Sequence, residues 1–583
     1  MLLFGDEKMA HSTGSTGSPF PKWQLAVALG ATGAIGLGYW YMKNYSLDKT
    51  KKHSKGSLLE FGKKSSSSVD ESTETKTSVE KTPLQLALQH KAEGNDFFKK
   101  GTYDKAIACY TKAIEECPVD NGSDLATFYQ NRAAAYEHLK KYSSVIDDCT
   151  KALECKSNYV KALYRRARAY EAIKNWSDCL DDVSAVCLLQ AFQDQSALVM
   201  ADRVLKELGR KHANEAIANR IPVTPSKHFI KTYFLSFSED PAYNLINSDL
   251  PVQPEDEVTE NVAVSGFMRA RKAFLDRNFD DVVPACTEEI DSSESEAQYK
   301  LEALLLRGTF HLLRGTHDEA LDDLQAVISN EQADVKLRVS ALIKRASLYM
   351  QLEKQDECIK DFDQAAELGP NISDVFHHRG QVHLLMDKIE EATKDFDRAV
   401  DLNPNFPIAY VQKCYSDYRQ ALNARDVAKV QKCMNNFASA TEKFPKCSEC
   451  YILYAQVLAD QQKYDKADEY YEKALVLDSS NATVFVHKGL LTLQWTGDTE
   501  KAVQLMQTAI ERDPLCEFAY ETLATVEVQR SNLENAISLF DKAIKLAKTE
   551  LEMTHLFSLR DAAVSQLKIS KKLGLTLPSM SGL

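Results

Sequence analysis

The chain has 583 residues, of which 44% are hydrophobic and 27% are charged, and its formal net charge is −13. This length exceeds what one compact core usually holds, and the apolar content suffices for a large folded body, which excludes disorder of the whole chain. The acidic balance, with no Lys/Arg block and no zinc-finger spacing, argues against nucleic acid as a partner.

The first feature along the chain is an uncharged apolar segment. Residues 23–42, WQLAVALGATGAIGLGYWYM, follow a short leader, 1–22. About 20 helical residues just cross a ~30 Å hydrocarbon core, and aromatic residues at both ends suit the lipid boundary, so we predict one transmembrane helix. The rival interpretation is a cleaved secretory signal, which is usually shorter and ends at small residues. The glycines of the segment either pack against a partner helix or are simply tolerated in lipid.

The residues after this segment are basic and then polar. Residues 43–64 contain seven lysines against two acidic residues, whereas the leader has two lysines against two acidic residues. Positive charge favours the cytosolic side of a span, so we expect the rest of the chain to stay in the cytosol. Residues 43–82 are rich in Lys, Ser, Thr and Glu and are typical of a flexible tether.

From residue 84 onward the pattern is helical and repeats with a period near 34 residues. The two clearest copies share a small residue, an alanine, an aromatic residue, a second alanine and a proline at identical spacing: Gly380, Ala392, Phe396, Ala399 and Pro404, and Gly94, Ala106, Tyr110, Ala113 and Pro118. This period is typical of tetratricopeptide repeats, which are helix pairs that stack into a superhelix. We therefore predict an all-α fold.

The repeats fall into two arrays. Three repeats fit residues 84–192, and about eight fit residues 262–550. The break, 193–261, carries five prolines around the apolar FIKTYFLSF (229–237), so we expect a helix-interrupting connector whose apolar stretch packs on a neighbour. Residues 551–583 are predicted to form a capping helix and a loose tail.

Together these features resemble one family, the seventy-kilodalton receptor of the mitochondrial outer-membrane translocase. The resemblance rests on the N-terminal span, the tether, the three-plus-eight repeats and the connector NRIPVTPSKHFIKTYF (219–234), which is similar to that family's Pro-Ser-x-x-Phe-Ile-Lys segment. It implies an outer-membrane receptor that collects hydrophobic precursors, such as carrier proteins, from cytosolic chaperones and works with other translocase subunits. The alternative is a membrane-anchored co-chaperone or scaffold on another organelle, such as the endoplasmic reticulum.

Five residues of the first array form a candidate binding site. Lys91 and Asn95 are four apart on one predicted helix, Lys161 and Arg165 are four apart on another, and Asn131 precedes Arg165 by 34 residues. Residues four apart share a helix face, so the five side chains are expected to converge on one groove. Three cations and two amides suit a pair of carboxylates, such as a peptide C-terminus and an acidic side chain.

This pattern is similar to the carboxylate clamp of tetratricopeptide co-chaperones. The similarity implies binding of the Glu-Glu-Val-Asp tails of 70-kDa and 90-kDa heat-shock chaperones. If the five residues do not bind such a tail, they form an ordinary solvated helix face.

Candidate precursor-binding residues in the second array come from the corresponding helix positions. They are five apolar residues with three polar neighbours: Leu305, Leu306, Ile343, Ile452 and Leu453, and His377, His378 and Gln381. Apolar residues at helical spacing also form the core between repeats, so both interpretations stay open.

We expect neither an enzyme nor a cofactor. The sequence has no phosphate-cradling Gly-rich loop after a strand, no His-Glu-x-x-His and no nucleophile elbow, and repeats fill nearly all of the ordered chain. His377, His378 and His383 lack a carboxylate or cysteine at ligand spacing, and Cys447 and Cys450 lack a second cysteine pair, so we assign no metal. The thirteen cysteines are expected to be reduced, mostly as core residues.

Overall fold

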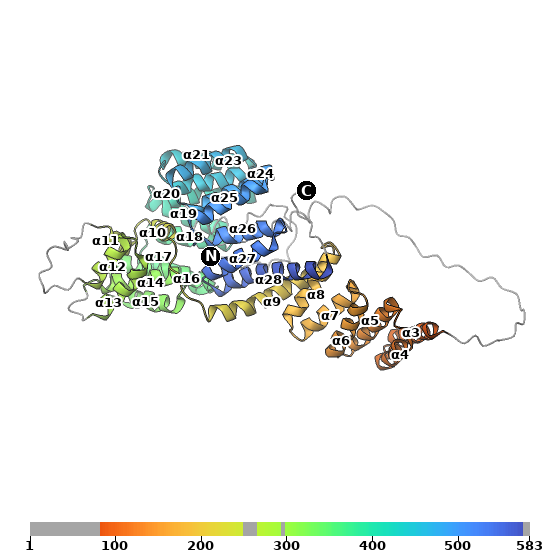
Figure 1. Ribbon diagram of the computed structural model, residues 1–583. Coiled ribbons are helices and arrows are strands. Elements are labelled where there is room, and N and C mark those ends of the chain that lie inside the picture. Colours follow the sequence, from red (N-terminus) through yellow and green to blue (C-terminus); the bar gives the residue numbers. More distant parts are fainter. Residues whose placement is uncertain (1–81, 249–264, 293–297, 575–583) are drawn as a thin grey trace, which may run out of the picture.

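The computed structural model describes residues 82–248, 265–292 and 298–574 (Figure 1). Every regular element in these ranges is a helix, which confirms the predicted all-α fold of tetratricopeptide repeats. The predicted leader, transmembrane helix and nearly all of the tether fall in 1–81, outside the described residues. No helix within the described ranges has both the length and the apolar character needed to cross a bilayer.

The first array consists of three consecutive helix pairs at one end of the molecule (Figure 1). Their bounds are Pro83–Lys99 (α3) with Tyr103–Glu116 (α4), Gly122–His138 (α5) with Tyr142–Cys155 (α6), and Val160–Ala172 (α7) with Trp176–Leu189 (α8). The array begins at a capping box: Thr82 accepts a hydrogen bond from the Gln85 backbone N–H, and the Gln85 side chain accepts one from the Thr82 backbone N–H. This exchange satisfies backbone donors that the first helical turn leaves unpaired.

Close approach of the two helices explains the small and aromatic positions of the repeat. A Cβ added at Gly94 would lie 2.7 Å from the ring of Tyr110, and one at Gly380 would lie 3.1 Å from the ring of Phe396. Both aromatic rings are buried. The small residue therefore leaves the space into which the aromatic residue of the second helix packs.

The second array contains eight further helix pairs in the described residues. Their bounds are Gly266–Leu275 (α12) with Val282–Asp291 (α13), Lys300–Arg314 (α14) with His317–Ser329 (α15), Val335–Gln351 (α16) with Gln355–Leu368 (α17), Ser373–Leu385 (α18) with Ile389–Leu402 (α19), Pro407–Asn423 (α20) with Val427–Lys443 (α21), Ser448–Asp460 (α22) with Tyr464–Leu477 (α23), Ala482–Thr496 (α24) with Thr499–Arg512 (α25), and Glu517–Gln529 (α26) with Leu533–Leu546 (α27). A short 3-10 turn, Phe279–Asp281 (η2), precedes α13.

The connector is more helical than its prolines suggest. Its first part is a 23-residue helix, Gln195–Ile217 (α9), which begins at the capping residue Asp194. The stretch before Pro222 has no proline, and its apolar residues recur at helical spacing, which explains this helix. Two shorter helices follow, Lys227–Leu235 (α10) and Pro241–Ile246 (α11), and the apolar side chains of α10 pack into the core of the second array.

The last helix, Glu550–Leu573 (α28), lies along α9 and joins the two arrays (Figure 1). An added Cβ at Gly209 on α9 would lie 2.5 Å from the backbone oxygen of Thr554 on α28. His212 on α9 lies 2.8 Å from the carboxylate of Asp561, and Lys568 pairs with Asp181 on α8. The joint therefore combines close backbone contact with polar pairs that α28 forms with the connector helix α9 and with the first array.

Arg220, just after α9, connects distant parts of the second array. Its guanidinium donates hydrogen bonds to the backbone oxygens of Arg314 (2.6 Å), Gly315 (3.3 Å) and Ala547 (2.9 Å). Arg314 ends α14 and Gly315 follows it in the turn to α15, whereas Ala547 lies between α27 and α28. One side chain thus holds an early turn and a late turn of the array together.

We predict that Gly209→Ala lowers the free energy of unfolding by about 1–3 kcal/mol, because the added methyl group meets backbone atoms of α28 that cannot move aside freely. Gly122→Ala is the control: its Cβ has no neighbour closer than 3.9 Å, so the substitution is expected to leave stability unchanged or slightly higher. Thermal unfolding of both variants measures the difference. Equal melting of Gly209→Ala and the wild type would show that α9 and α28 adjust to the methyl group.

Candidate functional site

A recurring ion pair orients the first helix of several repeats. In five of the described repeats, an arginine donates two hydrogen bonds of 2.7–3.0 Å to an aspartate 16 residues later on the second helix: Arg132–Asp148, Arg166–Asp182, Arg307–Asp323, Arg345–Asp361 and Arg379–Asp395. Two parallel hydrogen bonds fix the guanidinium plane as well as its position. The residue before each arginine lies roughly 100° from the arginine around the helix axis, so its side chain points away from the aspartate.

This geometry places two of the predicted clamp residues. Asn131 directly precedes Arg132 on α5, and Arg165 directly precedes Arg166 on α7. They therefore occupy the same face of successive first helices. Lys161 lies one turn before Arg165 and is exposed to solvent.

The two predicted asparagines contact each other across repeats one and two. The Asn131 side-chain amide donates to Oδ1 of Asn95 at 3.3 Å, and the Tyr110 hydroxyl donates to the same oxygen at 2.8 Å. Burial raises the pKa of Tyr110 to about 12, so this hydroxyl keeps its proton at physiological pH. Because the Asn95 oxygen already accepts two hydrogen bonds, its NH₂ group is the part of the amide suited to donate to a ligand.

Arg165 is held by an acidic neighbour that the sequence pattern did not indicate. Its Nε donates to Glu137 on α5 at 2.9 Å, and Nη1 donates to the backbone oxygen of Gln130, next to Asn131, at 3.4 Å. Arg168 pairs with the other oxygen of Glu137 at 3.2 Å. Glu137 thus orients the Arg165 guanidinium before any ligand is present, and a ligand carboxylate would share the guanidinium with it.

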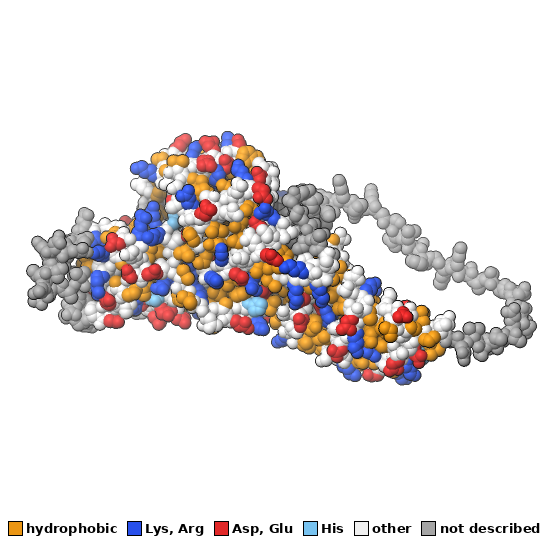
Figure 2. All heavy atoms as spheres, in the orientation of Figure 1, with side chains coloured by type: hydrophobic (Ala, Val, Ile, Leu, Met, Phe, Trp, Pro, Cys, Tyr) orange, Lys and Arg blue, Asp and Glu red, His pale blue; other side chains and the backbone are white. Residues whose placement is uncertain are grey.

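The remaining residue of the predicted clamp, Lys91, is half-buried on α3. Its ammonium lies 5.8 Å from the ring centroid of Phe128 on α5. Lys91 itself stands one helical turn before Asn95 on α3. Acidic and basic side chains are interspersed on the face of the first array visible in Figure 2. A clamp here therefore depends on the placement of its three cations rather than on a surface of one sign.

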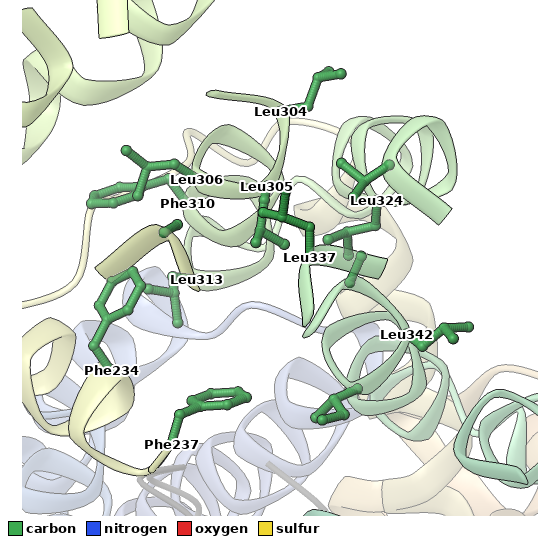
Figure 3. Close-up of a cluster of buried hydrophobic side chains, with 14 of the residues drawn as sticks. Phe234, Phe237, Leu304, Leu305, Leu306, Phe310, Leu313, Leu324, Leu337 and Leu342 are labelled. Carbon is green, nitrogen blue, oxygen red and sulfur yellow. The ribbon is translucent and has the colours of Figure 1, made fainter. Parts of the chain in front are cut away.

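The apolar residues predicted for precursor binding are buried. Leu305 and Leu306 on α14 and Ile343 on α16 belong to one large hydrophobic cluster, and Figure 3 draws both leucines among Phe310, Leu313 and Leu337. Ile452 and Leu453 on α22 belong to a second cluster. In this arrangement these side chains form the core between repeats, the alternative that the sequence left open, because neighbouring helices cover them and the connector adds to the first cluster.

The polar neighbours on α18 are buried as well. His378 Nδ1 lies 3.0 Å from Oε1 of Gln381, and Nε2 of His377 lies 3.2 Å from Nε2 of Gln381. Burial lowers the pKa of His378 to about 4 and that of His377 well below its ordinary value, so both rings are neutral. Within the described ranges, no group of three or more His, Cys, Asp or Glu residues is placed to hold a metal ion.

Known proteins resemble this chain in its repeats and over nearly its whole length. Models of the tetratricopeptide repeat match residues 97–120, 339–372, 373–406, 448–481 and 495–550. The mitochondrial import receptor subunit TOM70 of Rattus norvegicus is 44% identical over 589 residues, which cover 98% of this chain and 96% of the rat protein. The chain belongs to the TOM70 family.

A second mammalian TOM70 gives the same result. The TOM70 of Homo sapiens is 44% identical over 96% of this chain and 94% of its own length. The crystal structure of yeast Tom70 covers 84% of this chain and 99% of the yeast chain, with 25% identity and a TM-score of 0.47. Membership of the TOM70 family confirms the resemblance seen in the sequence and assigns the chain to the mitochondrial import receptors.

Because Leu305 is fully buried, we predict that Leu305→Ser lowers the free energy of unfolding by about 2–5 kcal/mol, through the lost contacts and a buried hydroxyl. The control is Val335→Ser at the start of α16, where 43% of the residue is exposed and the expected change is about 0.5 kcal/mol or less. Circular dichroism during heating compares the two. A Leu305→Ser protein that melts like the wild type but loses precursor capture would instead favour a surface role.

Proposed function

We propose that the first array binds the acidic C-terminal tails of 70-kDa and 90-kDa heat-shock chaperones. The observation that carries this proposal is the placement of Asn95, Asn131 and Arg165 on the first helices of three successive repeats, with Asn95 and Asn131 in direct contact. Lys91 and Lys161 lie one helical turn before Asn95 and Arg165. Three cations and two amides match a terminal carboxylate and a neighbouring acidic side chain.

Pre-orientation of these groups supports tight recognition of a flexible tail. Tyr110 holds Asn95, and Glu137 holds Arg165, so less side-chain entropy is lost when a peptide is bound. The extended tail itself loses its freedom on binding, which limits the affinity per contact. Such a site suits a chaperone that docks and then departs.

The chain as a whole is then a receptor for import into mitochondria. We assign residues 23–42 to a single span of the outer membrane, with the arrays in the cytosol, and the second array to hydrophobic precursors such as carrier proteins. The precursors would pass from the docked chaperone to the second array and on to other translocase subunits. Joining of the arrays through α9 and α28 supports such a transfer within one molecule.

The clamp predicts that Arg165→Ala reduces the affinity for a Glu-Glu-Val-Asp peptide at least tenfold, about 1.4 kcal/mol, because a carboxylate loses its charged partner. Lys161→Ala is expected to act in the same direction with a smaller effect. Asn95→Ala and Asn131→Ala are expected to weaken binding without changing its salt dependence, since they remove no charge. Isothermal titration calorimetry at two salt concentrations measures these effects.

Arg168→Ala is the matched control, because Arg168 also pairs with Glu137 but lies on the exposed side of α7. Its expected change in affinity is less than twofold. A peptide with an amidated C-terminus should reproduce the Arg165 defect on the wild type, and the two changes together should cost less than their sum. Equal binding of the amidated and free-acid peptides would contradict the clamp.

Residues 1–64 fused to a fluorescent protein test the proposed membrane attachment. We expect the fusion to label the mitochondrial surface and to resist extraction by alkaline carbonate, because an apolar span is followed by a basic flank. Exchange of Ala26, Ala28 and Leu29 for aspartate is the control that removes the apolar character. Labelling of the endoplasmic reticulum by the unaltered fusion would contradict the assignment.

A further inference from the structure

The connector segment Phe237–Asp240 lies against the first helices of two repeats of the second array. It follows α10 and leads into α11, where Asp240 is the N-terminal cap and accepts from the Tyr243 backbone N–H at 2.8 Å. Residues 240 and 344 are 104 positions apart in the chain, yet their side chains are paired. The segment is therefore a distant part of the chain brought onto the repeats.

On α16 the segment meets a cation. The ammonium of Lys344 forms an ion pair with the carboxylate of Asp240, and both side chains are fully buried. The Ser340 hydroxyl, one turn earlier on α16, donates to the same carboxylate at 3.4 Å. A buried charge of this kind is stable only with a partner, so the carboxylate is an essential part of the contact.

On α18 the segment is recognised through its backbone and its ring. The carboxylate of Asp374 accepts hydrogen bonds from the backbone N–H groups of Ser238 (2.8 Å) and Glu239 (3.1 Å). The ring of Phe237 lies against the imidazole of His378, with 4.3 Å between the centroids. Two successive backbone donors, an aromatic ring and a carboxylate are features by which proteins bind short extended peptides.

The residues that hold the segment occupy the repeat positions of the clamp. Lys344 directly precedes Arg345 of the recurring ion pair, as Arg165 precedes Arg166, and Ser340 stands four residues earlier, as Lys161 does.

The same comparison places His378 and Asp374 before Arg379 on α18. The segment is therefore contacted by both residues on α16, Ser340 and Lys344, and by both on α18, Asp374 and His378.

We propose that α16 and α18 form a second peptide-binding groove, and that Phe237–Asp240 occupies it as an internal ligand. The groove is selective for a short segment in which an aromatic residue is followed, three positions later, by an acidic one. Such a segment from another protein binds there only by displacing the connector. This inference rests on the second array alone, so it stands or falls separately from chaperone docking by the first array.

The first test is hydrogen exchange of the wild-type full chain, followed by mass spectrometry. A displaceable ligand opens locally, so the amides of Ser238 and Glu239 should exchange at least tenfold faster than those in the middle of α16 and α18. Exchange at the same rate as these helices would mean that the segment leaves only when the array unfolds, and would overturn the proposal. This measurement needs no substitution and is independent of folding defects.

The second test uses a labelled peptide with the sequence of residues 233–241, YFLSFSEDP, and fluorescence anisotropy. The full-chain variant Phe237→Ala with Asp240→Asn loosens the internal segment, while asparagine retains the α11 cap. We expect this variant to bind the peptide at least tenfold more tightly than the wild type does. Adding Lys344→Gln should remove the gain, because the peptide carboxylate then lacks its partner.

The matched control is Glu239→Gln, which alters a neighbouring acidic side chain that is 57% exposed and pairs with Lys336 at the surface. It should bind the peptide no better than the wild type, and a peptide with the same residues in scrambled order should not bind any variant. If the loosened variant is folded and does not bind the peptide, the segment is a fixed part of the core and the proposal is wrong.

Discussion

The recurring pair between an arginine and an aspartate sixteen residues later sets the geometry on which both proposed binding faces depend. Each pair ties the first helix of a repeat to the second and stops the first helix from rotating about its axis. The residue before the arginine consequently lies on a fixed side of the first helix, away from the aspartate. In the first array that residue is Asn131 or Arg165, and in the second it is Leu306, Lys344 or His378.

The two arrays use these positions differently. In the first array these positions hold hydrogen-bond donors that are partly open to solvent. Among the described contacts of Arg165, the acidic partner is Glu137. In the second array the positions are covered by the connector, and the lysine is fully buried with Asp240. A single repeat geometry thus supports both the open groove proposed for the first array and the occupied groove proposed for the second.

Much of the fold was predictable because its determinants are local. The spacing of small and aromatic residues reflects contact within one helix pair, as between Gly94 and Tyr110, and it therefore recurs in the sequence. The candidate clamp residues were proposed for the same reason, since a spacing of four residues places Lys161 and Arg165 on one face of α7.

Contacts between distant segments were not predictable in this way. The burial of Leu305 and Ile343 depends on packing between elements, and the same apolar spacing describes both a groove and a core. The connector covers α16 through Asp240, which lies about a hundred residues earlier in the chain than its partner Lys344. The orientation of Arg165 by Glu137 was missed because this pair is not part of the recurring arginine–aspartate pattern and so leaves no periodic signal.

The contacts of α9, Arg220 and α28 also affect how the chain reaches its folded state. In a simple stack of repeats each unit contacts only its neighbours, so folding can spread from one unit to the next. Here His212 meets Asp561, and Arg220 meets Ala547, across separations of 349 and 327 residues. Because a ribosome makes α28 after both arrays, the arrays emerge before the helix that joins them, and the joint forms only once α28 has left the ribosome.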